Sequence, residues 1–318
     1  MNFFTSHKEW CYSFIIAVLL VVGYSLTLAP PSDFPSRSIA VVARGAVVSE
    51  VATELADARI IAHPTLLRFV LRVSGQSARV QAGAYLFNTP ENLLTVAWRL
   101  ATGDFGLPPV RITFPEGETA REMSVRVNDA FPDISASDFL SAAQPYEGYL
   151  FPDTYLFLPS ANAASIVAIM RENFNEKIQP LSGAIAESGH SLSDLVTMAS
   201  LIEKEARSTA ARRMVSGILW NRLARNMPLQ VDAVFGYIHG RDTYSPSYAD
   251  LKVDSPYNTY THRGLPPGPI SNPGMDSISA ALYPTKTDYL YYLTGTDGLM
   301  HYATTYAGHQ ANQRKYLR

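Results

Sequence analysis

The chain has 318 residues, enough for two domains and one further segment. Hydrophobic residues make up 47% and charged residues 17% of it, as in folded proteins rather than disordered ones. The net charge of −2 gives no basic surface for nucleic acid, and the single cysteine excludes an intramolecular disulfide and a thiolate-rich zinc site. No two histidines have the HxxxH spacing, so we expect no metal and no other cofactor.

The first distinctive segment is a run of 20 residues without a charge, residues 10–29 (WCYSFIIAVLLVVGYSLTLA). Such a run can cross a bilayer core of about 30 Å as a helix. The alternative is a cleaved signal peptide, but two prolines follow the run, and proline directly after a scissile bond hinders cleavage. We therefore expect a single-pass transmembrane anchor, with residues 1–9 in the cytoplasm and residues 30–38 as a Pro- and Ser-rich stalk outside it.

Two short strand–turn–helix units follow. Their strands are predicted over residues 39–42 and 110–114, and both units carry glycine, four further residues and then glutamate. Between them, residues 83–87 and 93–100 have the patterns of another strand and helix. Repeats of this kind resemble the glycan-binding LysM module. They predict a LysM-like α+β domain over residues 39–135.

Residues 136–318 are predicted to form a second, mixed α/β domain, which makes the whole chain α+β. The elements expected there are an aromatic loop or strand edge over 147–155, helices over 163–178, 191–206 and 210–225, a loop over 230–233, rigid Pro- and Gly-rich loops over 257–274, a short helix over 277–282, and a strand pair over 289–294 and 301–303. The Pro-rich loops cost little entropy to order, because proline fixes φ in advance.

The helix over residues 191–206 (SLSDLVTMASLIEKEA) carries two carboxylates beside its apolar face. Ser193 or Asp194 is its predicted N-cap. At about 100° per residue, Glu203 and Glu205 lie on opposite flanks of the apolar stripe, too far apart to cooperate on one substrate. A groove over one flank would desolvate the carboxyl there and raise its pKa, as a general acid at neutral pH requires. The alternative is two solvated glutamates bordering a core helix.

Six motifs follow one another from residue 147 onward. They are EGYLFPDTY (147–155), ASLIEKEA (199–206), NRL (221–223), PLQVDA (228–233), SPYNTYTHRGLPPGPISNPG (255–274) and TDYLYYL (287–293). In this combination the chain resembles the endolytic murein transglycosylases, the YceG-like family. The resemblance extends over the chain from about residue 39.

The resemblance implies a bacterial enzyme of the inner membrane whose catalytic domain faces peptidoglycan on the periplasmic side. Such enzymes cut the glycan strand internally between N-acetylmuramic acid and N-acetylglucosamine and leave a 1,6-anhydro end. The activity would terminate strand elongation, with penicillin-binding protein synthases as expected partners. The family's catalytic glutamate is mapped onto Glu203, the first acid of IEKEA. One carboxyl suffices, because the substrate's own C6 hydroxyl replaces the external nucleophile of an ordinary glycosidase.

Substrate-binding candidates come from the same motifs. Tyr257 and Tyr260, with the loop over residues 264–268, are expected to hold the sugar in shape. Gln230 and Asp232 are expected either to bond the acetamido and hydroxyl groups or to fix the Glu203 carboxyl, with loop capping as the alternative.

Asn258 is likewise expected either to bond the sugar's acetamido and hydroxyl groups or to fix the Glu203 carboxyl, with loop capping as the alternative. Glu147 either supports catalysis or ties its own loop down. His262 and His301 are expected to be hydrogen-bond donors rather than catalytic bases. The flanks of Asp232 depart from the family pattern, in which a small polar residue followed by Asp-Pro is expected. This departure affects the expected substrate contacts and not the acid.

A non-catalytic, membrane-anchored scaffold that binds glycan and recruits cell-wall synthases is the competing hypothesis. A Glu203→Gln variant separates the two, since only an enzyme would lose bond cleavage while folding and binding persist. A zinc or serine hydrolase is excluded, because the sequence offers no metal-ligand set and no GxSxG motif.

Overall fold

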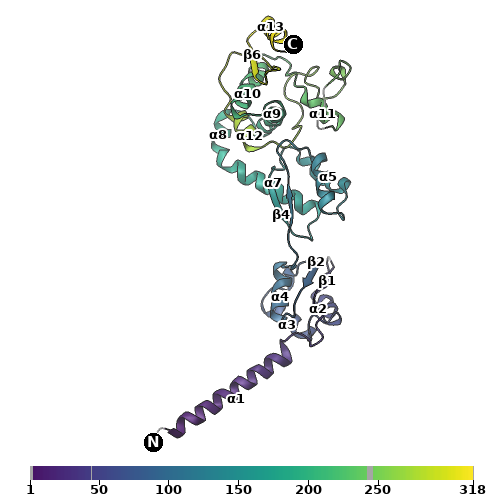
Figure 1. The fold of residues 1–318 in the computed structure, drawn as a ribbon, viewed down its shortest axis with the longest axis vertical. Helices are drawn as coiled ribbons and strands as arrows, with labels where there is room; N and C mark the ends of the chain where they lie inside the picture. The colour runs from purple at the N-terminus through teal and green to yellow at the C-terminus, as the bar shows by residue number, and fades with distance from the viewer. Residues whose placement is uncertain (1–2, 44, 242–245, 318) are drawn as a thin grey trace. The chain divides into compact units, whose positions relative to one another are not determined.

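The structure is a computed structural model that describes residues 3–43, 45–241 and 246–317. The chain forms two compact units, Met1–Val110 with Phe157–Ala161 and Arg111–Leu156 with Asn162–Arg318 (Figure 1). The mixed α+β class is confirmed. Residues 111–135, which belong to the predicted first domain, pack within the second unit.

The first unit begins with helix α1 (Phe3–Thr27). Two prolines follow shortly after it, and proline cannot continue a helix. Within the described part of the chain, no helix is both long enough and apolar enough to cross a membrane. The predicted transmembrane span over residues 10–29 is therefore helical as far as Thr27, but the structure does not support it as a membrane span.

The rest of the first unit is a two-stranded antiparallel sheet covered by helices. Its elements are β1 (Ser38–Val42), α2 (Val48–Asp57), α3 (Pro64–Val73), the 3₁₀ turn η1 (Ser77–Arg79), β2 (Gly83–Phe87) and α4 (Leu93–Thr102). The two strands pair from Ser38 opposite Phe87 to Val42 opposite Gly83. Alternate strand residues are buried under the helices, as the period of two requires. The predicted strands and helices of this region are confirmed, and α3 is an additional helix.

The second unit starts with a small sheet and the helices beside it. Strand β3 (Val110–Thr113) pairs with β4 (Thr154–Phe157). Between them lie α5 (Ala120–Ala130), α6 (Ala136–Ala143) and the 3₁₀ turn η2 (Gln144–Tyr146), with α5 packed on α6. The predicted helix at Thr119 is confirmed, because the Thr119 side chain caps α5.

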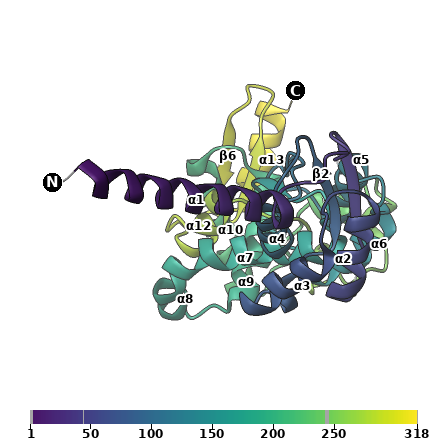
Figure 2. The same cartoon turned by 90° about the horizontal axis from the view of Figure 1, so that it is seen from below.

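The remaining elements of the second unit surround its main core. They are α7 (Ala163–Ile178), η3 (Gln179–Leu181), α8 (Ser182–Ser188), α9 (Leu192–Glu205), α10 (Thr209–Ala224), α11 (Ala233–His239), η4 (Asp250–Lys252), α12 (Met275–Leu282), β5 (Tyr291–Thr294), β6 (Met300–Ala303) and α13 (Tyr306–Tyr316). Strands β5 and β6 form an antiparallel hairpin, with Tyr292 opposite Tyr302. Figure 1 shows α9, α10 and α12 grouped together, and Figure 2 shows α10 beside α12, in agreement with their mutual packing.

Helix α9 lies at the centre of this core. Every residue from Leu195 to Ile202 is buried, so the helix is covered on all sides rather than on one apolar stripe. Its N-cap is Ser191, which forms a capping box with Asp194, and not Ser193 or Asp194 itself. The buried helix ends at Glu205, and this fixes the two acidic side chains in its last turn.

Candidate active site

The two glutamates at the end of α9 have entirely different neighbours. Because they are two residues apart, their side chains leave the helix on opposite flanks, as predicted. Glu203 faces α10 and the start of α12, whereas Glu205 faces the start of α11 and the hairpin β5–β6.

Glu203 is part of a buried ion pair. Its side chain is only 5% exposed, and Oε1 accepts a hydrogen bond from Arg212 Nη2 at 2.5 Å. Oε2 accepts the backbone N–H of Gly274 at 3.0 Å. Arg212 also donates to Asp276 at 2.8 Å and to the carbonyl of Ala206 at 3.1 Å. Both oxygens of Glu203 thus hold α9, α10 and the start of α12 together.

Glu205 is in a cluster of polar groups instead. Its carboxylate accepts the Tyr292 hydroxyl at 3.0 Å and the backbone N–H of Ala233. Burial raises its pKa to about 7, and the nearby negative charge of Asp232 acts in the same direction. These effects outweigh the hydrogen bonds and the charge of Arg222, which favour the ionised form. The residue as a whole is half-buried, as is Glu203.

Two of the predicted substrate-binding residues lie beside Glu205 rather than beside Glu203. The Tyr260 hydroxyl donates to Asp232 Oδ1 at 2.5 Å. The Asp232 carboxylate acts on the pKa of Glu205, and both acids act on that of Tyr260. Burial and the neighbouring carboxylates raise the pKa of Tyr260, so this hydroxyl stays protonated.

Two further residues of this cluster, Tyr292 and Arg222, lie within the TDYLYYL and NRL motifs but were not among the predicted site residues. Arg222 is buried and donates to the carbonyls of Leu290 and Leu229, both at 2.6 Å. These bonds hold the residues that precede β5 and α11 near the end of α9. A guanidinium inside the apolar pattern of α10 is the signal that could have identified it.

The other predicted loop residues have different roles. Asn258 is fully buried, and its Nδ2 donates to the carbonyls of Leu251 and Val253 at 3.1 and 2.9 Å. Its Oδ1 accepts the backbone N–H of Tyr260 at 3.0 Å, so all of its contacts cap the loop. Gln230 is exposed.

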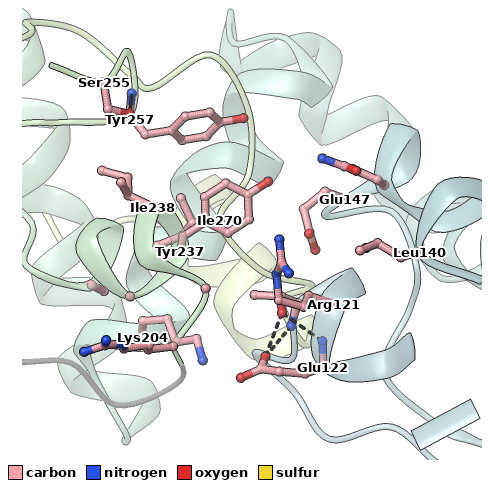
Figure 3. Close-up of a pocket in the computed structure, with 16 residues that line it drawn as sticks. Arg121, Glu122, Leu140, Glu147, Lys204, Tyr237, Ile238, Ser255, Tyr257 and Ile270 are labelled. Atoms are coloured by element: carbon pink, nitrogen blue, oxygen red, sulfur yellow. Dashed lines mark hydrogen bonds between the residues drawn. The ribbon is translucent and has the colours of Figure 1, made fainter. Parts of the chain in front are cut away.

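A pocket of about 490 Å³ lies in the second unit, next to this cluster (Figure 3). It is lined by the first turn of α5, one face of α11, Glu147 and Tyr257, among others. The rings of Tyr237 and Tyr257 lie 5.0 Å apart and form one wall. Lys204, which stands between the two glutamates in the sequence of α9, is part of the lining.

Glu147 has the contacts of a residue that ties its loop down. Its two oxygens accept the backbone N–H of Ala120 at 3.0 and 3.1 Å, and Oε1 also accepts Asn272 Nδ2 at 2.8 Å. Burial raises its pKa to about 7, against the effect of both hydrogen bonds. Asn272 is fully buried and also binds the backbone N–H groups of Gly148 and Leu150.

We expect Asn272→Ala to lower the free energy of unfolding by about 2–5 kcal/mol, because several buried groups lose a hydrogen-bond partner. Chemical denaturation measures the change. Asn128→Ala is the matched control, since Asn128 makes one bond, to the carbonyl of Ile134, and its loss costs about 0.5–1.5 kcal/mol. Equal effects of the two substitutions would contradict the central role of Asn272.

The histidines have the contacts of hydrogen-bonding and stacking residues. His301 Nε2 lies 3.0 Å from Asp297 Oδ2, and its ring stacks on Tyr316. His262 Nδ1 lies 3.1 Å from the Thr261 hydroxyl. Among the residues that the structure describes, no group of three His, Cys, Asp or Glu is placed to hold a metal ion.

A sequence model of the YceG-like family matches residues 40–315. A Bacillus subtilis protein named endolytic murein transglycosylase is 32% identical over 94% of this chain and 91% of its own length. A protein of the same name from Streptococcus pneumoniae is 28% identical over 98% of this chain and 65% of its own length. A crystal structure of a yceG-like protein from Listeria monocytogenes, 30% identical, aligns with a TM-score of 0.59 over 86% of this chain and 98% of its own. The chain therefore belongs to the YceG-like family.

Proposed function

We propose that this protein is a lytic transglycosylase that cleaves peptidoglycan strands internally. The family membership and the names of the relatives support this activity. The observation that carries it is Glu205, a carboxyl with its pKa raised to about 7 that accepts the Tyr292 hydroxyl within a cluster of polar groups. The first test is incubation of the full chain with purified peptidoglycan, where release of soluble glycan fragments is expected and its absence would count against the proposal.

We assign the role of general acid to Glu205 in place of Glu203. A general acid needs a proton at neutral pH and an oxygen that can reach the leaving group. The raised pKa of Glu205 meets the first condition, and its place beside Asp232 and Tyr260 is the ground for proposing the second. Glu203 does not meet the second condition, since Arg212 and Gly274 engage both of its oxygens and its side chain is buried.

In the proposed reaction, the Glu205 carboxyl gives its proton to the glycosidic oxygen while the bond from this oxygen to C1 of N-acetylmuramic acid breaks. The C6 hydroxyl of the same sugar then attacks C1, and the Glu205 carboxylate accepts the hydroxyl proton. The products are a strand with a free 4-hydroxyl on N-acetylglucosamine and a strand with a 1,6-anhydro end. Water is not consumed, and the carboxyl returns to its starting state. Holding the sugar in a bent shape favours the internal attack.

The neighbours of Glu205 support this double role. The Tyr292 hydroxyl stabilises the Glu205 carboxylate after the proton has left. Burial and the charge of Asp232 then favour reprotonation of this carboxylate. The proximity of Asp232 and Tyr260 to this acid makes them the proposed contacts for the sugar's hydroxyl and acetamido groups. Tyr257, in the wall of the neighbouring pocket, is proposed to contact the adjacent sugar.

The activity should depend on pH through Glu205. Because the protonated form is the acid, kcat/KM should fall as the pH rises through about 7, with a limiting tenfold loss per pH unit. Initial cleavage rates between pH 5 and 9 measure this profile. A kcat/KM that rises through pH 7 would mean that the group at this position acts first as a base.

Peptidoglycan lies outside the cytoplasmic membrane, and we place the catalytic unit there on this ground. The strand–helix–helix–strand order of the first unit supports its assignment as LysM-like and glycan-binding. Termination of strand growth beside penicillin-binding protein synthases would follow from cleavage of nascent strands. Protease treatment of intact spheroplasts tests the location, since the second unit should be degraded; a fully protected chain would contradict it.

A further inference from the structure

We propose that the 490 Å³ pocket beside Glu205 binds a carboxylate carried by the glycan strand, with Arg121 as its cationic contact. The inference rests on the proposed function and extends it from the cleaved bond to the group that is recognised next to it.

The pocket and the proposed acid share structural elements. Ala233, whose backbone N–H binds Glu205, lines the pocket with Gly236 and Tyr237 from the same face of α11. Lys204 lines it as well and directly precedes Glu205 on α9. When the glycosidic oxygen of a substrate lies at Glu205, a group on the sugar beside the cleaved bond can therefore reach the pocket.

The charges in the pocket favour an anion. Its lining contains three cationic side chains, Arg121, Lys204 and Arg241, and two acidic ones, Glu122 and Glu147. Both acidic groups have hydrogen-bond partners at the start of α5, and the charge of Lys204 also acts on Glu147, so Arg121 is the proposed contact for a bound anion. Glu122 binds the backbone N–H and hydroxyl of Thr119 at 2.7 and 2.9 Å, and Glu147 binds Ala120 and Asn272.

Arg121 has the best position to meet a ligand. Figure 3 shows its guanidinium between Tyr237 and Glu147, pointing into the pocket. The residue is exposed, and it packs against Gly240, where an added Cβ would lie 3.2 Å from Nε. An arginine fork can bind a carboxylate through two parallel hydrogen bonds, which a lysine cannot do.

The pocket also has the walls of a small-molecule site. The Tyr237 and Tyr257 rings lie at 50° to each other, and Ile270 belongs to the same lining. A volume of about 490 Å³ lies within the range of ordinary ligand sites, roughly 300–1,000 Å³. An apolar and aromatic wall opposite a cationic group suits an amphipathic branch such as a sugar substituent or a short peptide.

A glycan strand can supply the carboxylate in two ways. N-Acetylmuramic acid carries a lactyl group, which is a free carboxylate when no peptide is attached. In peptide-bearing strands the lactyl group is an amide, and the carboxylates belong to the peptide. Oligosaccharides of N-acetylglucosamine alone have neither, so they serve as the uncharged reference.

The test measures binding by the full chain with Glu205→Gln, so that no ligand is cleaved. The ligands are peptide-bearing strands, strands freed of peptide by an amidase, and N-acetylglucosamine oligomers of matched length. Adding Arg121→Gln should weaken binding of a carboxylate-bearing strand about tenfold or more and leave the uncharged oligomers unchanged. The type of strand that loses affinity identifies the source of the carboxylate.

Arg126→Gln is the matched control, because Arg126 is on the same helix but pairs with Glu118 and lies outside this pocket. Arg121→Lys, which keeps the charge but not the two parallel hydrogen bonds, provides a second probe if Arg121→Gln does not fold, as judged by its thermal midpoint. Equal weakening for charged and uncharged ligands, no change from either substitution, or failure of any carboxylate-bearing strand to bind would overturn the inference. Cleavage by the unsubstituted chain tests the proposed function separately.

Discussion

Glu205→Gln should reduce the rate of glycan cleavage about 10²- to 10⁴-fold, the usual contribution of a positioned general acid. The amide has nearly the same shape but cannot supply the proton. The fold should survive, because the amide oxygen can still accept the Tyr292 hydroxyl and a neutral side chain suits this buried position. The measurement is the initial rate of release of soluble glycan, with circular dichroism as the check on folding.

Glu203→Gln is the comparison that makes this test decisive. The amide oxygen can still accept a hydrogen bond from Arg212 or from the backbone N–H of Gly274. Protein that folds should therefore keep most of its cleavage activity. If Glu203→Gln removes activity from folded protein while Glu205→Gln does not, the acid is Glu203, as the motif alone suggested.

Arg212→Met should lower the free energy of unfolding by about 3–5 kcal/mol, because it leaves the buried Glu203 carboxylate without its cation. Methionine keeps most of the side-chain volume, so the loss is mainly electrostatic. Urea denaturation measures the change.

Arg213→Met is the matched control for this second prediction. Arg213 is the next residue on α10 and is exposed, so its substitution should change stability by no more than about 0.5 kcal/mol. A loss for Arg212→Met no larger than for Arg213→Met would show that the buried pair is not needed to hold α9 and α10 together.

The sequence predicted most of the local structure around the site. Hydrophobic periodicity indicated α9 and placed Glu203 and Glu205 on opposite flanks, and both points are confirmed. Periodicity could not show what surrounds each of the two acids. That depends on Arg212 from the next helix and on Tyr292, 87 residues farther along the chain, and neither contact is encoded in the helix itself.

The loop residues were harder to interpret. Asn258 and Asn272 have the same residue type and lie in the same Pro- and Gly-rich segment, yet each satisfies a different set of buried backbone groups. Short helices were also missed. Helix α11 has only seven residues and no side-chain cap, so neither its periodicity nor an N-terminal capping signal predicts it.

Residues 111–135 were predicted to lie in the first domain because they repeat the strand–turn–helix pattern of residues 39–57. In the structure their strand β3 pairs with β4 and their helix α5 packs on α6. Local similarity therefore described the elements correctly but not their tertiary partners, which are set by long-range packing.

The most direct test of the central claim is digestion of peptidoglycan in water enriched in ¹⁸O, with the new strand ends read by mass spectrometry. A lytic transglycosylase with Glu205 as its single acid and base should leave 1,6-anhydro ends without any ¹⁸O, and the Glu205→Gln variant should leave few or none. New reducing ends that carry ¹⁸O would show that water is the acceptor and would contradict the proposed mechanism.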